Sequence, residues 1–212
     1  MTNVQIVGRR SSLFTRVVLV FAEELAIDYE FVPIHDMLSL GPEAYADNPA
    51  LKLPILRMDG STLFGAQNIC RALSERASSD RLIVWPENLG DDLSRNAQEL
   101  VWHCMAAQVQ FVMGAVLGKL PADNPFFIKT VRGLDGSLRW LDSHLPQAIA
   151  ALPATRELSM FEVSIFCLIE HLIFRPTVPV EAYPALLTFT REFADRPAAQ
   201  RTAYRFDVRP QT

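Results

Sequence analysis

Cysteine is scarce in this sequence, and its three cysteines show no pairing pattern. Cys70, Cys104 and Cys167 stand far apart in a chain of 212 residues, without Cys-x-x-Cys spacing. An odd number of widely separated cysteines argues against a disulfide framework and against a zinc knuckle. The four histidines also lack the spacing of metal ligands. We therefore expect buried, free thiols and no metal site.

The sequence also lacks an excess of charge of one sign and a long apolar run. Its 20 basic and 24 acidic side chains are scattered, and the formal net charge is −4. Nucleic-acid and anionic-membrane partners need clustered Lys and Arg, so we expect neither partner. No apolar run approaches the roughly 20 residues that span a bilayer, and the N-terminus lacks a basic segment followed by an apolar core. These absences predict a cytoplasmic protein with no membrane partner.

The first third of the chain alternates between strand and helix patterns, which predicts the order βαβ followed by ββα. In chain order we expect a strand at 4–7, a helix from Ser11 or Ser12 to about Leu25, a strand at 27–32, an irregular connection with one helical turn at 33–50, two strands on either side of the Asp59-Gly60 turn, and a helix at about 67–77. The Asp-Gly pair between apolar flanks is a strong hairpin signal.

The remainder of the chain is helical by pattern, after a polar, proline-bearing stretch at 79–89 that we interpret as a linker. Asp91 and Asp92 open the first of these helices, where acidic side chains favour the positive end of the helix dipole. Ser159 and Glu162 have the spacing of a capping box at the start of a later helix.

Pro54 interrupts a run that otherwise has the pattern of a strand. Because proline has no amide hydrogen, it belongs at an edge, a strand start or a bulge. The amide and carbonyl of the preceding Leu53 are then available to a partner other than the protein itself.

Several ordered segments resemble the glutathione transferase family, in particular its bacterial, serine-type members. They are 8–12 before a helix ending in Glu24-Leu25, then Tyr29-Glu30, Asn48-Pro49, 52–56, Asp59-Gly60, 63–73, 159–163, Tyr183-Pro184 and 196–200. The resemblance covers nearly the whole chain. It implies a thioredoxin-like domain at 1–78 with a mixed four-stranded sheet, a linker at 79–89, and an all-helical domain at 90–212.

The resemblance also implies how glutathione binds as co-substrate. In this family a cis proline stands where Pro54 does, and the residue before it, here Leu53, pairs with the cysteinyl part of the tripeptide. A serine at the start of the first helix donates to the glutathione sulfur. We take Ser11 or Ser12 for that role, although a serine pair also simply caps a helix. Arg16, one turn on, either lowers the thiol pKa or, as we favour, is a solvated side chain.

The sequence departs from the family at 65–68. The family commonly has Glu or Gln followed by Ser there, to hold the γ-glutamyl group, whereas this chain has Gly65 and Ala66. Backbone amides at a helix N-terminus still bind a carboxylate, and Gln67 is a candidate to replace part of the lost contact. Lys52 is the candidate for the glycyl carboxylate.

The family resemblance predicts the conjugation of the glutathione thiolate to a small hydrophobic electrophile, by a homodimer. Candidates for the electrophile pocket are Phe14, Trp102, Met105 and Phe111, although such side chains at helical spacing more often belong to a core. Two alternatives remain open. One is another glutathione-dependent activity, such as isomerisation, dehalogenation or reduction. The other is a non-catalytic binding protein that has lost the tripeptide, which the Ala66 departure motivates.

Overall fold

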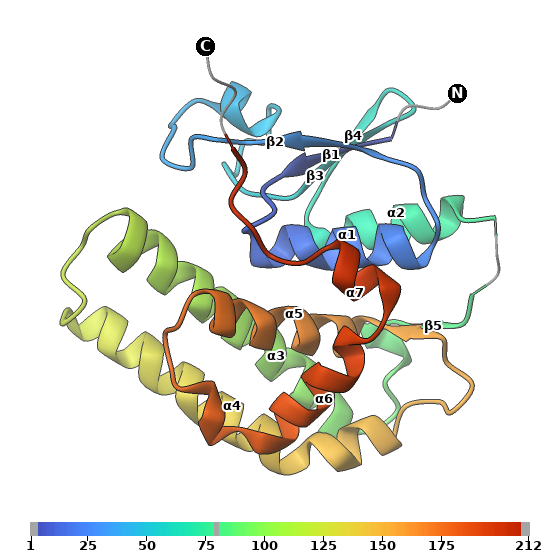
Figure 1. The fold of residues 1–212 in the computed structure, drawn as a ribbon, viewed down its shortest axis with the longest axis vertical. Coiled ribbons are helices and arrows are strands. Elements are labelled where there is room, and N and C mark those ends of the chain that lie inside the picture. Colours follow the sequence, from blue (N-terminus) through green and yellow to red (C-terminus); the bar gives the residue numbers. More distant parts are fainter. Residues whose placement is uncertain (1–3, 79–80, 209–212) are drawn as a thin grey trace. The chain divides into compact units, whose positions relative to one another are not determined.

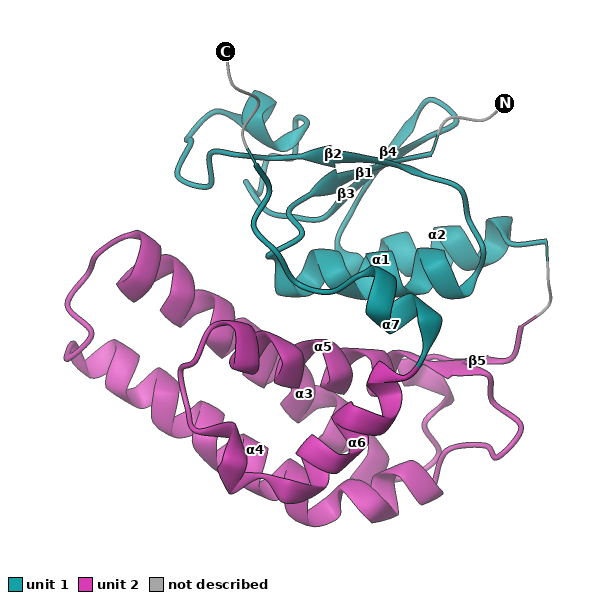
Figure 2. Ribbon diagram, viewed as in Figure 1, with its two compact units in different colours: residues 1–80, 196–212 teal, residues 81–195 magenta. Residues whose placement is uncertain are grey.

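The structure is a computed structural model that describes residues 4–78 and 81–208. The chain divides into two compact units, one of residues 1–80 with 196–212 and one of residues 81–195 (Figure 2). This division differs from the expected one, because the C-terminal segment returns to unit 1 and unit 2 begins inside the expected linker. Ser79 and Asp80 of that linker, and residues 209–212, lie outside the described part.

Unit 1 is built on a four-stranded sheet in the order β2-β1-β3-β4. Its strands are β1 (Gln5–Gly8), β2 (Glu30–Pro33), β3 (Ile55–Met58) and β4 (Ser61–Phe64). Strand β1 is parallel to β2 and antiparallel to β3, and β3 is antiparallel to β4. The expected mixed sheet is therefore confirmed.

Two helices cover one face of this sheet, α1 (Leu13–Glu24) between β1 and β2, and α2 (Ala66–Arg76) after β4 (Figure 1). The connection between β2 and β3 contains the one expected helical turn, η1 (Pro42–Tyr45). Unit 1 thus has the predicted thioredoxin-like order βαβ-ββα.

Helix α1 is apolar on nearly every side because it is enclosed within unit 1. It packs against α2 and against α7 (Pro197–Arg201), a short helix from the returning C-terminal segment. Arg196 Nε donates to Glu24 Oε1 at 2.7 Å, and Arg201 pairs with Glu23. These two ion pairs fasten the C-terminal segment to the end of α1.

Unit 2 is helical apart from one short parallel strand pair. Its elements are β5 (Ile83–Val84), η2 (Pro86–Asn88), α3 (Asp92–Phe111) with a π-helical continuation at Val112–Leu117, α4 (Pro125–Ala150), β6 (Leu158–Ser159), α5 (Met160–Phe174), η4 (Val180–Ala182) and α6 (Pro184–Ala194). The sequence did not predict β5 and β6, because strands of two residues are too short to show a period.

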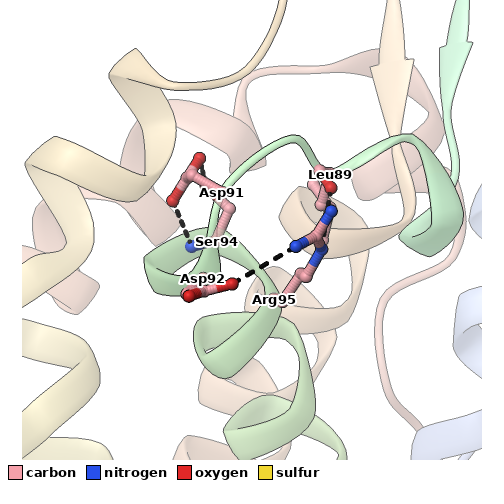
Figure 3. Close-up of polar contacts among 5 residues, drawn as sticks. All are labelled: Leu89, Asp91, Asp92, Ser94 and Arg95. Atoms are coloured by element: carbon pink, nitrogen blue, oxygen red, sulfur yellow. Dashed lines mark hydrogen bonds and ion pairs between the residues drawn. The ribbon is translucent and has the colours of Figure 1, made fainter.

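The start of α3 has the acidic side chains that the sequence predicted there, and Asp91 is in addition the N-cap of the helix (Figure 3). The Asp91 carboxylate accepts from Ser94 N at 2.9 Å and from Ser94 Oγ at 2.8 Å. Arg95 donates to Leu89 O at 3.1 Å and pairs with Asp92 at 3.2 Å. The hydrogen bonds from Ser94 hold the pKa of Asp91 below its ordinary value.

The start of α5 confirms half of the predicted capping box and corrects the other half. Ser159 Oγ accepts from Glu162 N at 3.0 Å, as expected. The Glu162 carboxylate, however, binds the guanidinium of Arg156 through contacts of 2.8 and 2.7 Å. A bidentate ion pair is stronger than a hydrogen bond to one neutral amide. The Glu162 carboxylate therefore binds Arg156 and not the Ser159 amide.

One helix corrects the expectation that no segment is long and apolar enough to cross a membrane. Residues Asp92–Leu117, which form one continuous helix of 26 residues, meet that test by length and composition alone. The core helices of many globular proteins pass the same test, and α3 packs against α4 and α5 within unit 2. The helix is therefore weak support for a membrane span.

We predict that Gly8→Ala destabilises the protein. A Cβ on Gly8 would lie 2.6 Å from Thr15 Oγ1 and 2.7 Å from Thr15 Cγ2, and Thr15 is fully buried at the start of α1. Overpacking of this kind costs about 1–3 kcal/mol of unfolding free energy. The control is Gly136→Ala in α4, where a Cβ meets nothing within 4 Å and helix propensity improves. Denaturant unfolding measures both; equal stability of Gly8→Ala and wild type would contradict the packing argument.

Candidate functional site

The candidate site lies in unit 1, where β1 ends and β3 begins. The Leu53–Pro54 peptide bond is cis, as the family resemblance predicted. In the antiparallel ladder Val7 of β1 faces Ile55 of β3, so the segment before Pro54 lies beside the turn that leaves β1. That turn leads to Ser11 and Ser12.

The backbone of Leu53 is open. No described residue makes a hydrogen bond to its amide or its carbonyl. Its side chain is half-buried and packs against the apolar cluster that includes Tyr45 and Ile55. A fixed side chain with free backbone groups is the arrangement that an added antiparallel strand needs.

Asn48 holds the loop that approaches Leu53, a role that the sequence did not reveal. It is 3% exposed, and its side chain spans the loop. Asn48 Nδ2 donates to Lys52 O at 2.8 Å, while its Oδ1 accepts from Ala50 N at 3.0 Å. These bonds satisfy Lys52 O and Ala50 N, whereas the amide and carbonyl of Leu53 are left for another partner.

The two candidate serines have different structural roles. Ser12 is the N-cap of α1 and is half-buried, and its Oγ accepts from Thr15 N at 3.4 Å. Because this bond uses Ser12 as an acceptor, the hydroxyl proton of Ser12 remains available for donation. Ser11 is 6% exposed, and its hydroxyl makes no hydrogen bond with any described residue. Both hydroxyls are therefore able to donate.

Arg16 is not the solvated side chain that we favoured. It is 1% exposed. One guanidinium nitrogen donates to Ala199 O at 3.3 Å, and the guanidinium stacks on the ring of Tyr204 at 4.3 Å. The expectation was wrong because the C-terminal segment, far away in the sequence, covers this side of α1.

The same segment supplies a residue that the sequence did not place at the site. Asp207 accepts from the backbone amide of Arg10 at 2.9 Å and from its guanidinium at 3.5 Å, and the Asp207 side chain is 4% exposed. The Arg10 guanidinium also lies 3.9 Å from the centre of the Phe31 ring. The Asp207 carboxylate therefore fixes the turn at Arg10, which precedes Ser11 and Ser12.

The N-terminus of α2 is uncapped. Its N-cap, Gly65, has φ +87°, and no side chain makes a cap hydrogen bond there. No described residue accepts from the amides of Ala66, Gln67 or Asn68. A Cβ on Gly65 would meet nothing within 4 Å, so there is free space beside this residue. Free amides and the helix dipole favour an anion at this point.

Lys52 is exposed, and no described residue pairs with it. The candidates for an electrophile pocket belong to different units. Phe14 is half-buried in unit 1. In unit 2, Trp102 and Phe111 are half-buried, Phe111 meets Phe127 edge to face, and Met105 is 1% exposed. Their role in binding stays a prediction.

The described residues hold no cluster of histidine, cysteine and acidic side chains able to bind a metal. The three cysteines are free and buried, as expected. Burial raises the pKa of Cys104 to about 12. A thiol with such a pKa stays protonated at neutral pH and is a poor nucleophile.

Residues 6–81 match the family model described as "Glutathione S-transferase, N-terminal domain". Unit 1 therefore carries a domain of the glutathione S-transferase N-terminal family, in agreement with the resemblance. No curated protein sequence matches the chain.

Solved structures show that the fold extends over both units. A glutathione S-transferase from Methylobacillus flagellatus with bound glutathione is 23% identical, with a TM-score of 0.74 over 95% of this chain and 99% of the other. One from Methylobacterium radiotolerans, complexed with glutathione sulfonate, is 16% identical, with a TM-score of 0.75 over 99% of each chain. Poplar glutathione transferase F1 is 19% identical, with a TM-score of 0.70 over 95% and 97%.

We predict that alanine substitution of Ser12 and of Ser11 changes the free energy of unfolding by different amounts. Ser12→Ala removes the cap of α1 and should lower the free energy of unfolding by about 0.5–1 kcal/mol. Ser11→Ala removes a hydroxyl without a partner and should change it by less than about 0.5 kcal/mol, since no hydrogen bond is lost. Denaturant unfolding of both variants measures the difference. A larger loss for Ser11→Ala would show that its hydroxyl has a structural partner.

Proposed function

We propose that this protein is a glutathione transferase that conjugates the glutathione thiolate to a small hydrophobic electrophile. The observation that carries the proposal is the open backbone of Leu53 beside Pro54. This edge offers one donor and one acceptor to a peptide in antiparallel orientation. Pairing with this edge uses backbone atoms only, so the residues Gly65 and Ala66, which replace the family's usual ones, do not affect it.

The charged groups of glutathione have matching partners on the same unit. The free amides at the start of α2 suit the γ-glutamyl carboxylate. Lys52, which is exposed and lacks a partner among the described residues, suits the glycyl carboxylate. Gln67 stands in the first turn of α2, where it contacts the γ-glutamyl group in place of the missing serine. The cysteinyl unit between the two ends then pairs with Leu53.

The reaction needs the thiolate form of the ligand. A free thiol has a pKa of about 8.5, and lowering it by about two units requires roughly 2.7 kcal/mol of preferential stabilisation. Ser11 or Ser12 donates its hydroxyl proton to the sulfur at the positive end of the α1 dipole. The thiolate attacks an electrophilic carbon, forms the sulfur–carbon bond, and expels a leaving group with its bonding electrons or adds across a double bond.

A different glutathione-dependent reaction at this site, such as isomerisation or dehalogenation, would use the same thiolate. Analysis of the reaction products distinguishes it from conjugation. A non-catalytic binding protein is separated by the absence of turnover. We further propose a cytoplasmic homodimer, with Phe14, Trp102, Met105 and Phe111 as candidate contacts of the electrophile.

Calorimetric titration with glutathione tests the proposed function. We expect a saturable heat and a rise in the thermal midpoint at millimolar ligand, because a ligand that binds only the folded state stabilises it. The absence of both effects would contradict the transferase proposal and favour the binding protein. If glutathione binds, the ultraviolet absorbance of its thiolate should fall in Ser11→Ala or in Ser12→Ala. Unchanged absorbance in both would remove the serines from the reaction.

We predict that Ala66→Ser tightens glutathione binding. The new hydroxyl restores one hydrogen bond at the start of α2, worth about 1 kcal/mol, or roughly fivefold in affinity. The control is Ala72→Ser, further along α2, which should leave the affinity unchanged. Titration calorimetry measures both. An equal affinity of Ala66→Ser and wild type would place the γ-glutamyl group away from this helix.

A further inference from the structure

The end of the hairpin formed by α3 and α4 carries several exposed apolar side chains. We call residues 116–132 the tip; they contain the end of the π-helical continuation of α3, the loop that follows it and the first two turns of α4 (Figure 1). Four of the eleven exposed large apolar side chains among the described residues lie in the tip, each 40–56% exposed: Val116, Leu120, Phe126 and Ile128. A concentration of exposed apolar side chains often marks an interaction surface.

The inside of the tip is already filled by Phe127. This side chain is 4% exposed, and its ring meets Phe111 and Phe126 edge to face, with centroid distances of 5.8 and 5.4 Å. Gly114, just before the tip, leaves room for the ring, because a Cβ there would lie 2.3 Å from Phe127 Cζ. The protein itself therefore closes the inside of the hairpin, and the exposed apolar side chains remain for contact with another surface.

Basic residues accompany the exposed apolar side chains of the tip. The sequence has three lysines, and two of them, Lys119 and Lys129, lie in the tip together with Arg132. All three are exposed, and no described residue pairs with them. Asp123 is the one acidic residue of the tip, so three basic residues and one acidic residue give it a formal net charge of +2, whereas the whole chain has −4.

We propose that the tip binds the surface of a membrane that contains anionic phospholipids. The apolar side chains enter the interfacial region of the bilayer, and the three cations bind lipid phosphates; no segment crosses the membrane. Apolar side chains combined with Lys and Arg are the two signals that hold peripheral proteins at an interface. The inference goes beyond the proposed function, because it concerns unit 2 alone and requires neither glutathione nor an electrophile.

The charge of the tip favours an anionic lipid surface over a second copy of this chain. In a two-fold contact through the tip, the same residues of both copies face each other, so two charges of +2 repel. An anionic leaflet instead attracts all three cations. Salt screens charges beyond about 8–10 Å, so the charge of the tip and not that of the whole chain governs the contact. We expected no anionic-membrane partner from the scattered basic residues of the sequence, but at the tip unpaired cations and exposed apolar side chains coincide.

Co-sedimentation with vesicles tests this inference on the full chain. One set of vesicles contains phosphatidylcholine mixed with phosphatidylserine, which is anionic, and the other set contains phosphatidylcholine alone. We expect the wild type to bind the anionic vesicles at least about tenfold more tightly, because the cations contribute to binding only there. A higher salt concentration should weaken this binding, since salt screens the attraction.

The basic residues are tested with a double variant, Lys119→Gln with Lys129→Gln. Its matched control is Arg191→Gln with Arg205→Gln, which removes two exposed arginines outside the tip that have no partner among the described residues. We expect the first variant to bind anionic vesicles at least about tenfold more weakly than the wild type, and the control to stay within about twofold. Equal losses in both variants would overturn the inference, because binding would then follow the overall charge.

The apolar side chains are tested with Leu120→Ser, and Ile173→Ser is the control. Ile173, on α5, is 49% exposed and lies outside the tip. We expect Leu120→Ser to weaken binding to anionic vesicles at least about fivefold, because it removes an apolar side chain from the bilayer interface. Ile173→Ser should bind like the wild type. Thermal midpoints close to that of the wild type exclude a folding defect in either variant.

Failure of the wild type to bind anionic vesicles would overturn the inference. Vesicle binding that Leu120→Ser leaves unchanged would overturn it as well; if the same variant alters the sedimentation velocity of the protein without vesicles, the tip is a contact between copies of the chain. The glutathione titration does not depend on any of these results, so failure of this inference and failure of the proposed function are distinguishable.

Discussion

The site depends on one pair of backbone groups, the amide and carbonyl of Leu53, which have no partner among the described residues. Polar groups of the backbone are nearly always paired in a folded protein. Asn48 satisfies the loop before Leu53, and the ladder between β1 and β3 satisfies the strand after Pro54. Leu53 lies between these two sets of hydrogen bonds, so its amide and carbonyl are available to an added strand.

The rest of unit 1 holds this edge in place. Thr15 packs against Gly8, which fixes the first turn of α1 against the end of β1. The C-terminal segment covers Arg16 and fastens the turn before the serines through Asp207. The end of the chain therefore supports the residues that we propose for thiol activation, although nearly two hundred residues separate them in sequence.

Local patterns in the sequence predicted the local features of the fold. The order of strands and helices in unit 1, the acidic start of α3 and the buried cysteines are all present. The cis bond before Pro54, which the family resemblance implied, is present too. What was missed depends on contacts between distant segments. The burial of Arg16 and the contact of Asp207 with Arg10 depend on the C-terminal segment, which packs back onto unit 1. Hydrophobic periodicity and capping signals do not predict contacts between segments so far apart in sequence. At the site, the resemblance identified the edge at Leu53, but the role of Asn48 became visible only from hydrogen bonds.

Hydrogen exchange at the Leu53 amide tests whether a peptide ligand fills this edge. With saturating glutathione, the account predicts that exchange of this amide slows by at least about tenfold, because the cysteinyl carbonyl accepts its hydrogen. The Ala50 amide, which already donates to Asn48 Oδ1, should change little. An unchanged exchange rate at Leu53, with glutathione bound elsewhere on the protein, would contradict the account.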